Sequence, residues 1–311
     1  MSNNSSDQIY VNNAVFISGY SIILGLGFVL NFAALCFFYR LPQLRSPTNV
    51  YMKNLAFADI LLVCTLPLKI YDYTETQPTL PSRLCQVVGT LFLLNMYGSI
   101  FLLACISMDR CLAVCFPLRS KSFRHYAPWI CASAWGLNII SCSMVHIFSN
   151  KETFENTSNN CCFHMRPSVL TRKSTTVLSV VIGFMVPLGI MAVSSWALLR
   201  AVGHSQLVQI GVVNKEKIVR MLVTNLAIFL LCFLPYHVIL LCYQFLKTDL
   251  FNYYQITLLI ACSNAVLDPI AYYFAAETIQ RTVVKEMRLV GESDASAEKL
   301  RSSASLPPKG S

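Results

Sequence analysis

The chain has 311 residues, of which 55% are hydrophobic and only 13% are charged, and its mean hydropathy is +0.55. A soluble domain carries roughly a quarter charged residues, so this composition excludes an ordinary soluble protein. The formal net charge of +9 is compatible with nucleic-acid binding. The basic residues, however, flank long apolar blocks on one side, which indicates a membrane protein with no nucleic-acid partner.

Seven apolar blocks run along the chain, and each is close to the roughly 20 residues that a helix needs to cross a bilayer. We expect helices at residues 15–39, 48–72, 84–115, 127–148, 174–202, 216–246 and 251–274. The blocks should be helical because the backbone in lipid must satisfy its own hydrogen bonds, and no barrel-like alternation is present. The predicted fold is an all-α membrane protein, a bundle of seven transmembrane helices spanning residues 15–274.

The segments outside this bundle are short. Residues 1–14 lack a basic region and a small-residue cleavage site, so we expect them to remain as an extracellular amino terminus. Residues 275–290 alternate apolar and basic side chains, which predicts a short amphipathic cytoplasmic helix on the inner leaflet. Residues 291–311 are polar and rich in serine, and we expect them to form a disordered cytoplasmic tail.

The distribution of basic residues predicts the orientation. Most of the 24 Lys and Arg residues lie at or beyond the boundary that would face the cytoplasm, so the positive-inside rule places the amino terminus outside. Sequons at Asn3, Asn4 and Asn156 all fall on the outer side and are candidate glycosylation sites. We therefore expect a multi-pass protein of the plasma membrane.

Five ionisable residues lie within the predicted spans, where a charge is costly and usually marks function. They are Asp59 and Lys69 in the second span, Asp109 and Arg110 at the end of the third, and Asp268 in the seventh. A role for Asp59 and Asp268 as water-bridged packing groups is the alternative. Four spans also contain a proline that removes a backbone hydrogen bond and should kink the helix: Pro67, Pro187, Pro235 and Pro269.

Seven short motifs occur in order on the seven predicted helices. They are Asn31, Leu55-Ala56-Phe57-Ala58-Asp59, Asp109-Arg110-Cys111, Trp135, Pro187, Cys232-Phe233-Leu234-Pro235 and Asp268-Pro269-Ile270-Ala271-Tyr272. With these motifs, residues 15–289 resemble a rhodopsin-like (class A) G-protein-coupled receptor. The resemblance implies a receptor, not an enzyme, that responds to an extracellular ligand by activating heterotrimeric G proteins.

The same resemblance implies a bound ion. In that family the acid that matches Asp59 binds a structural sodium ion together with polar neighbours, and the matching positions here are Asn95, Ser99, Asn264 and Asp268. Pockets lined by oxygen atoms are what a hard cation requires. Bound sodium would favour the inactive state, and no other cofactor is expected.

The resemblance also implies a switch on the inner side. Arg110 would alternate between its neighbour Asp109 and the G protein, and Tyr272 would move inward on activation. Lys215 stands where the family has an acid on the sixth helix. An inactive state without that ionic lock is therefore expected.

A disulfide bridge is implied as well. Only Cys85, Cys161 and Cys162 lie at or beyond the outer boundary, where the compartment is oxidising. The family bridge would join Cys85 to the second outer loop, where both of the other two qualify. Cys162 is preferred because Cys162-Phe163-His164 resembles the same loop of the lysophosphatidylinositol receptor.

The outer end of the bundle indicates the ligand class. Residues 90–94 contain no acid for an amine, and residues 251–274 contain no lysine for retinal. Candidate ligand contacts are the basic residues of the outer side together with two side chains of the third and sixth spans: Lys69, Arg83, Arg166, Arg172, Lys247, Tyr97 and His237. Such a set predicts an anionic ligand. The residues at positions 69 and 247 resemble those of lysophosphatidic acid receptors, which implies a lysophospholipid.

Several alternatives stay open. Lys69 could extend outward or pair with Asp72 or Glu75, and a lone histidine such as His237 is more often a packing residue. A nucleotide or a small carboxylate is the alternative ligand, and an ion-coupled transporter is the alternative class of protein. Related receptors use G proteins of the G12/13, Gq or Gi class, and serines of the tail could recruit arrestin after phosphorylation.

Overall fold

The computed structural model describes residues 3–40, 47–74, 81–116, 124–153, 173–204, 215–246 and 250–270. Within these ranges the chain is helical and has no strand. The elements are α1 (Asn3–Arg40), α2 (Pro47–Val63), α3 (Leu66–Thr74), α4 (Ser82–Cys115), η1 (Arg124–Tyr126), α6 (Ala127–Thr153), α7 (Lys173–Leu178), η3 (Ser179–Met185), α8 (Val186–His204), α10 (Lys215–Leu246) and α11 (Phe251–Cys262), with a further helical stretch at 264–270.

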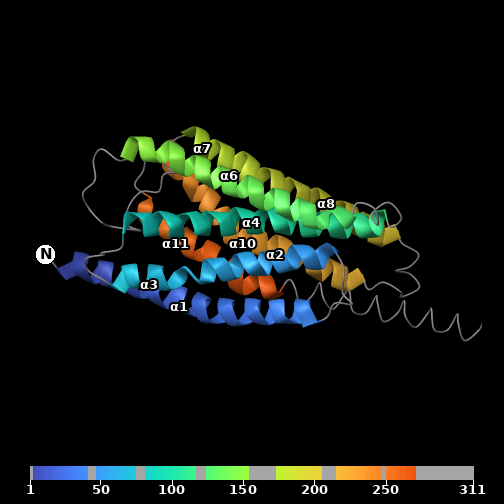
Figure 1. Ribbon diagram of the computed structural model, residues 1–311, viewed down its shortest axis with the longest axis horizontal. Coiled ribbons are helices and arrows are strands. Elements are labelled where there is room, and N and C mark those ends of the chain that lie inside the picture. Colours follow the sequence, from blue (N-terminus) through green and yellow to red (C-terminus); the bar gives the residue numbers. More distant parts are fainter. Residues whose placement is uncertain are drawn as a thin grey trace, which may run out of the picture.

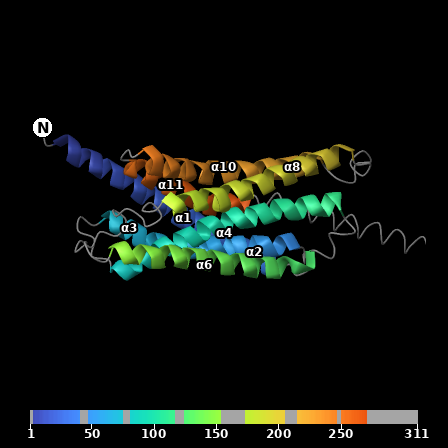
Figure 2. The ribbon, with the colours of Figure 1, turned by 90° about the horizontal axis from the view of Figure 1, so that it is seen from above.

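These helices run side by side along the long axis of the molecule (Figure 1). In the perpendicular view, α8 and α10 form one side of the bundle and α2 and α6 the other (Figure 2). The helix α4 lies between the two sides and contacts all four. Each predicted span contains a described helix, so the predicted helical bundle is confirmed. The predicted amphipathic helix at 275–290 and the tail at 291–311 lie outside the described residues.

Five of the described helical stretches are long and apolar enough, by length and composition, to cross a membrane: 13–40, 47–74, 83–115, 173–203 and 218–246. Over their described residues, α6 and α11 do not meet both criteria. The helix α1 begins at Asn3, so it extends well into the segment assigned to the amino terminus.

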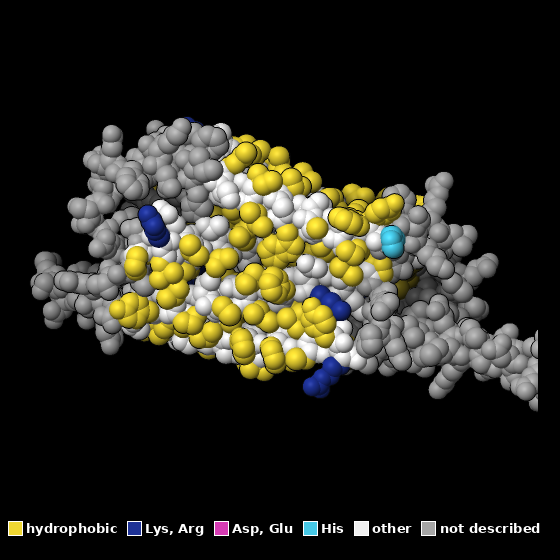
Figure 3. Space-filling model, viewed as in Figure 1, with side chains coloured by type: hydrophobic (Ala, Val, Ile, Leu, Met, Phe, Trp, Pro, Cys, Tyr) yellow, Lys and Arg dark blue, Asp and Glu magenta, His cyan; other side chains and the backbone are white. Residues whose placement is uncertain are grey.

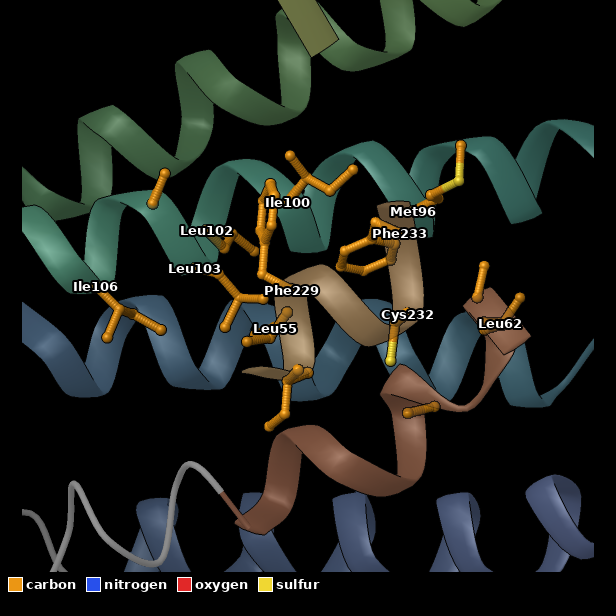
Figure 4. Close-up of a cluster of buried hydrophobic side chains, with 14 of the residues drawn as sticks. Leu55, Leu62, Met96, Ile100, Leu102, Leu103, Ile106, Phe229, Cys232 and Phe233 are labelled. Atoms are coloured by element: carbon orange, nitrogen blue, oxygen red, sulfur yellow. The ribbon is translucent and has the colours of Figure 1, made fainter. Parts of the chain in front are cut away.

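Buried and exposed side chains follow the pattern of a protein surrounded by lipid. Large apolar side chains are exposed on the outside, including Val29, Leu137, Val193 and Leu231, and the surface seen in Figure 3 is largely hydrophobic. Inside, Leu55 of α2, Leu103 and Ile106 of α4, and Phe229 and Phe233 of α10 lie together in one buried cluster (Figure 4). Because lipid is as apolar as these side chains, close packing rather than exclusion from water holds such helices together.

The second span is broken into two helices. A turn at Cys64 and Thr65 ends α2, and the Thr65 hydroxyl donates to the carbonyl of Leu62 at 2.7 Å. Pro67 follows in the first turn of α3, where a missing backbone N–H is tolerated. This break sets the direction of α3, and Lys69 and Asp72 are both buried in it.

The fifth and seventh spans are also irregular. A π-helical segment, η3, precedes α8 and is closed by a bond from the backbone N–H of Val186 to the carbonyl of Val181. In the last span, α11 ends at a turn where the Ser263 hydroxyl donates to the carbonyl of Ile260 at 2.6 Å. The turn places Asn264 and Asp268 on the short helical stretch that follows. By contrast, α10 continues unbroken through Pro235.

Candidate functional site

A polar pocket lies in the middle of the bundle. The amide of Asn95 on α4 donates to the carboxylate of Asp59 on α2 at 2.9 Å. The amide of Asn264 donates to the hydroxyl of Ser99 on α4 at 3.1 Å. The fifth predicted member, Asp268, interacts electrostatically with Asp59 and lies near Asn264. All five side chains are buried, so the structure brings the whole predicted set together.

The oxygen atoms of this pocket suit a hard cation. Two carboxylates lie close together in a buried region, and each oxygen of Asp268 lacks a donor at hydrogen-bonding geometry among the described residues. The amide oxygen of Asn264 also lacks a donor at hydrogen-bonding geometry among the described residues. Buried acceptors without donors are costly, and a sodium ion would satisfy them with oxygen ligands. The residues present therefore fit the ion that the family resemblance implies.

Two further side chains hold the helices around the pocket. The amide of Asn31 on α1 donates to the carbonyls of Gly27 at 2.9 Å and Ala265 at 2.6 Å, which ties α1 to the last span. The indole of Trp135 on α6 donates to the amide oxygen of Asn54 on α2 at 3.1 Å. Asn31 and Trp135 belong to the motifs noted in the sequence. In the structure the side chain of each donates a hydrogen bond to a neighbouring helix.

Two of the predicted switch residues, Asp109 and Arg110, lie near the C-terminal end of α4. Asp109 is buried there, and the hydroxyl of Thr48, at the start of α2, donates to its carboxylate. Arg110 is the next residue and is partly buried. Tyr272 and the side chain of Lys215 lie outside the described residues. The contact made by Thr48 was not predicted from the sequence. Thr48 follows Pro47 in the first turn of α2.

Lys69 on α3 is buried between two aromatic rings, which are called here the aromatic cage. Only 4% of its surface is exposed. Its ammonium lies 4.5 Å from the ring centroid of Phe92 on α4 and 5.2 Å from that of Tyr20 on α1. Both distances are in the range of cation–π attraction. Lys69 therefore does not extend outward to the surface.

The cage continues into an aromatic stack between α1 and α3. Phe16 stacks on Tyr73 with ring centroids 4.9 Å apart, and Tyr20 lies 6.0 Å from Tyr73. Tyr20 and Phe92 were not predicted from the sequence. A signal for Tyr20 was present, because Phe16 and Tyr20 are four residues apart and so lie on one face of a helix.

Tyr97 and His237 meet between α4 and α10. The His237 ring stacks on Phe184 at 4.4 Å and meets the edge of Tyr97 at 6.0 Å. Nδ1 of His237 lies 2.7 Å from the carbonyl of Phe233. Gly183 permits this arrangement, since a Cβ atom there would lie 2.6 Å from Cε1 of Tyr97. The two predicted contacts thus share one buried polar and aromatic region.

The remaining candidates are placed as follows. Arg83 is exposed at the start of α4. Cys85 is disulfide-bonded, and its partner lies outside the described residues, as do Cys161 and Cys162. Also outside them are Arg166, Arg172, Lys247 and Asn156, together with the side chains of Asn3 and Asn4.

Comparison with known proteins identifies the family. The family model described as 7 transmembrane receptor (rhodopsin family) matches residues 30–272. This chain belongs to that family. It is therefore a membrane receptor that couples to heterotrimeric G proteins, and not an enzyme.

Three similar relatives share about a third of their residues with this receptor. Lysophosphatidic acid receptor 6 of Homo sapiens is 34% identical over 291 residues, covering 88% of this chain and 84% of the relative. Lysophosphatidic acid receptor 4 of Mus musculus is 34% identical over 280 residues, covering 85% and 75%. Lysophosphatidic acid receptor 5 of Mus musculus is 34% identical over 283 residues, with the same coverage.

Proposed function

We propose that this receptor is located in the plasma membrane with its amino terminus outside, and that its ligand is an anionic lysophospholipid. The observation that carries the proposal is the Lys69 ammonium, a cation held inside the outer half of an apolar bundle. A charge inside an apolar bundle is energetically costly, and such residues therefore usually mark a functional site. The names of the relatives, lysophosphatidic acid receptors 4, 5 and 6, support the same ligand class.

The ligand would bind by two kinds of contact. Its phosphate would form charge-assisted hydrogen bonds with Lys69, which are stronger than bonds between neutral groups. Arg83, Arg166, Arg172 and Lys247 would attract the headgroup at the mouth of the bundle. The acyl chain would lie between apolar helix faces, and Tyr97 and His237 would line the deeper part of the site.

The response to the ligand would pass through the polar pocket to the inner switch. A sodium ion held by Asp59 and Asp268 would favour the inactive state, and agonist binding would favour its release. Arg110 would then exchange Asp109 for the G protein as Tyr272 moves inward. We propose the G12/13, Gq or Gi class as coupling partner and arrestin as a second partner after phosphorylation of the tail.

A cell assay of G-protein dissociation tests the ligand. The receptor is exposed to a panel of lysophospholipids, nucleotides and short carboxylates. A response to lysophospholipids that requires Arg110 supports the proposal. A response only to nucleotides or carboxylates supports the alternative ligand, and it leaves the receptor assignment intact.

A further inference from the structure

Two thiols lie in contact on one face of α4. Cys111 and Cys115 are four residues apart, so their side chains project from neighbouring positions on the helix surface. Their sulfur atoms are 3.8 Å apart. The proposed function uses neither thiol. Sulfur is the ligand that soft metal ions such as Zn²⁺ and Cu⁺ prefer, so a pair of sulfur atoms in contact is a candidate metal site.

The pair lies in the last two turns of α4, where the helix packs on α8. The Cys115 thiol donates to the carbonyl of Ala197 on α8 at 3.9 Å. Cys111 is buried and directly follows Arg110, whereas Cys115 is partly exposed. A metal ion can therefore reach the pair from the side of Cys115.

The distance between the two sulfur atoms matches a tetrahedral metal site. Zn²⁺ binds thiolate sulfur at about 2.3 Å, so two sulfur atoms on one tetrahedral ion are about 3.8 Å apart. The separation of 3.8 Å in the structure has the same value. The sulfur atoms therefore need not move relative to each other when an ion binds between them.

A disulfide between the same residues fits the helix less well. Cβ atoms four residues apart on a helix are about 5–6 Å from each other, whereas a disulfide requires about 3.5–4.5 Å. Oxidation of the pair would therefore distort the turn between Cys111 and Cys115. A metal ion adds two bonds between the sulfur atoms where a disulfide adds one, and it bridges the pair without that distortion.

The charge balance of a bound ion suits this part of the bundle. Zn²⁺ replaces the two thiol protons, so two S–Zn bonds form, two S–H bonds break and two protons enter the solvent. Two thiolates and one divalent cation carry no net charge, which keeps the cost of burial low. The helix α4 ends at Cys115, and the carbonyl end of a helix favours a nearby cation.

We propose that Cys111 and Cys115 chelate one Zn²⁺ ion through their two sulfur atoms. Among the described residues no third His, Cys, Asp or Glu joins them in a metal-binding group. Water or a small thiol in solution would complete the four-coordinate shell. Because the described residues supply two ligands, the site takes up and releases zinc as its concentration changes, unlike a closed site with four protein ligands. The proposal is independent of the receptor's ligand and of its orientation in the membrane.

Titration of the purified full-length receptor in detergent tests the site. Cd²⁺ serves as a probe because its bonds to thiolate sulfur absorb in the ultraviolet, and Zn²⁺ is then measured in competition with a chromogenic chelator. The parent should bind one ion at the pair and release two protons, measured in weakly buffered solution. Cys111→Ser and Cys115→Ser should each weaken zinc binding at least about tenfold, since changes even outside a coordination shell typically cost about 10–100-fold in affinity.

Spacing controls keep the number of thiols constant. In the Cys115→Ser background, Val114→Cys places two thiols three residues apart, and it should restore most of the affinity. Ala113→Cys in the same background places them two residues apart, where side chains do not face each other, and it should restore none. Cys242→Ser removes a partly exposed thiol of α10 and should have no effect. Thermal unfolding shows that each variant is folded.

Three results would overturn the site. One is a zinc affinity equal to that of the parent in both Cys111→Ser and Cys115→Ser. Another is equal affinity in the variants with thiols two and three residues apart, which would mean that spacing plays no part. The third is binding without proton release, or binding lost equally in Cys242→Ser, which would mean an adventitious ion only.

Discussion

The hydroxyl of Thr48 on α2 donates a hydrogen bond to the carboxylate of Asp109 on α4, and both side chains are buried. This bond joins two helices at the residue that precedes Arg110. It also fixes one orientation of the Asp109 carboxylate. The resemblance predicts that Lys215 replaces the family's sixth-helix acid, and we therefore expect contacts around Asp109 to stabilise the inactive state.

The first prediction follows from that bond. Thr48→Val keeps the size and shape of the side chain and removes the donor. We expect it to raise ligand-free G-protein activation severalfold, because a hydrogen bond to a charged group contributes about 1.5–3 kcal/mol. The measurement is basal G-protein dissociation, normalised to surface expression. Thr48→Ser keeps the donor and serves as the control. A basal signal in Thr48→Val equal to that of Thr48→Ser would contradict the prediction.

The second prediction concerns Lys69. Lys69→Ala should lower the potency of a phosphate-bearing lysophospholipid about 10- to 100-fold, because it removes a charge-assisted contact. A neutral monoacylglycerol of the same chain length should lose much less. Lys173→Ala, at the start of α7, is the matched control for a cation outside the cage. An unchanged dose–response curve for Lys69→Ala would remove this lysine from the ligand site.

The third prediction tests the close approach of Gly183 to Tyr97. A Cβ atom at Gly183 would lie 2.6 Å from Cε1 and 2.9 Å from Cδ1 of Tyr97, so the ring would have to move. Gly183→Ala should therefore destabilise the receptor by about 1–3 kcal/mol, the usual cost of overpacking. The midpoint of thermal unfolding in detergent measures the effect.

A double variant separates this clash from the change in helix propensity. Gly183→Ala should lower the unfolding midpoint much less in the Tyr97→Ala background than in the parent, because the ring that meets the added Cβ atom is gone. Gly189→Ala is the control, since a Cβ atom there meets nothing within 4 Å. Equal unfolding midpoints for Gly183→Ala and Gly189→Ala would show that Tyr97 does not restrict this position.

The fourth prediction concerns the polar pocket. Sodium should lower agonist affinity in the parent receptor, because the ion favours the inactive state. Asp59→Asn should abolish that dependence, since it removes a carboxylate that the cation requires. Agonist binding is measured against increasing sodium chloride, with choline chloride holding the ionic strength constant. The hypothesis fails if sodium lowers affinity equally in the parent and in Asp59→Asn.

The helical bundle could be predicted from the sequence because each span is a continuous apolar block of bilayer length. The breaks within the spans could not. Apolar residues flank the turn at Cys64 and Thr65 on both sides, so hydropathy does not show where α2 ends. Pro67 predicted a kink but not its direction, and Pro235 lies in a helix that continues through it. The π-helical η3 has the same apolar composition as the α-helix around it.

The candidate sites could be predicted only in part, for a similar reason. The pocket around Asp59 consists of residues that the family motifs mark by type and order. No family motif identifies the residues that contact Lys69. Tyr20 and Phe92 belong to different helices far apart in the chain, and nothing in the sequence pairs them with Lys69. Thr48 is likewise distant from Asp109 in the chain, and only the folded bundle brings the two together.

The π-helical segment η3 has a consequence for changes in chain length. A π-helical turn holds one residue more than an α-helical turn, so it can lose a residue and become α-helical. Deleting one residue between Ser179 and Met185 would leave Lys173–Leu178 and Val186–His204 facing the neighbours they face now. The same deletion inside α10 would rotate every later side chain of that helix by about 100°. The fifth span is thus a place where the register of the bundle can absorb a single-residue deletion.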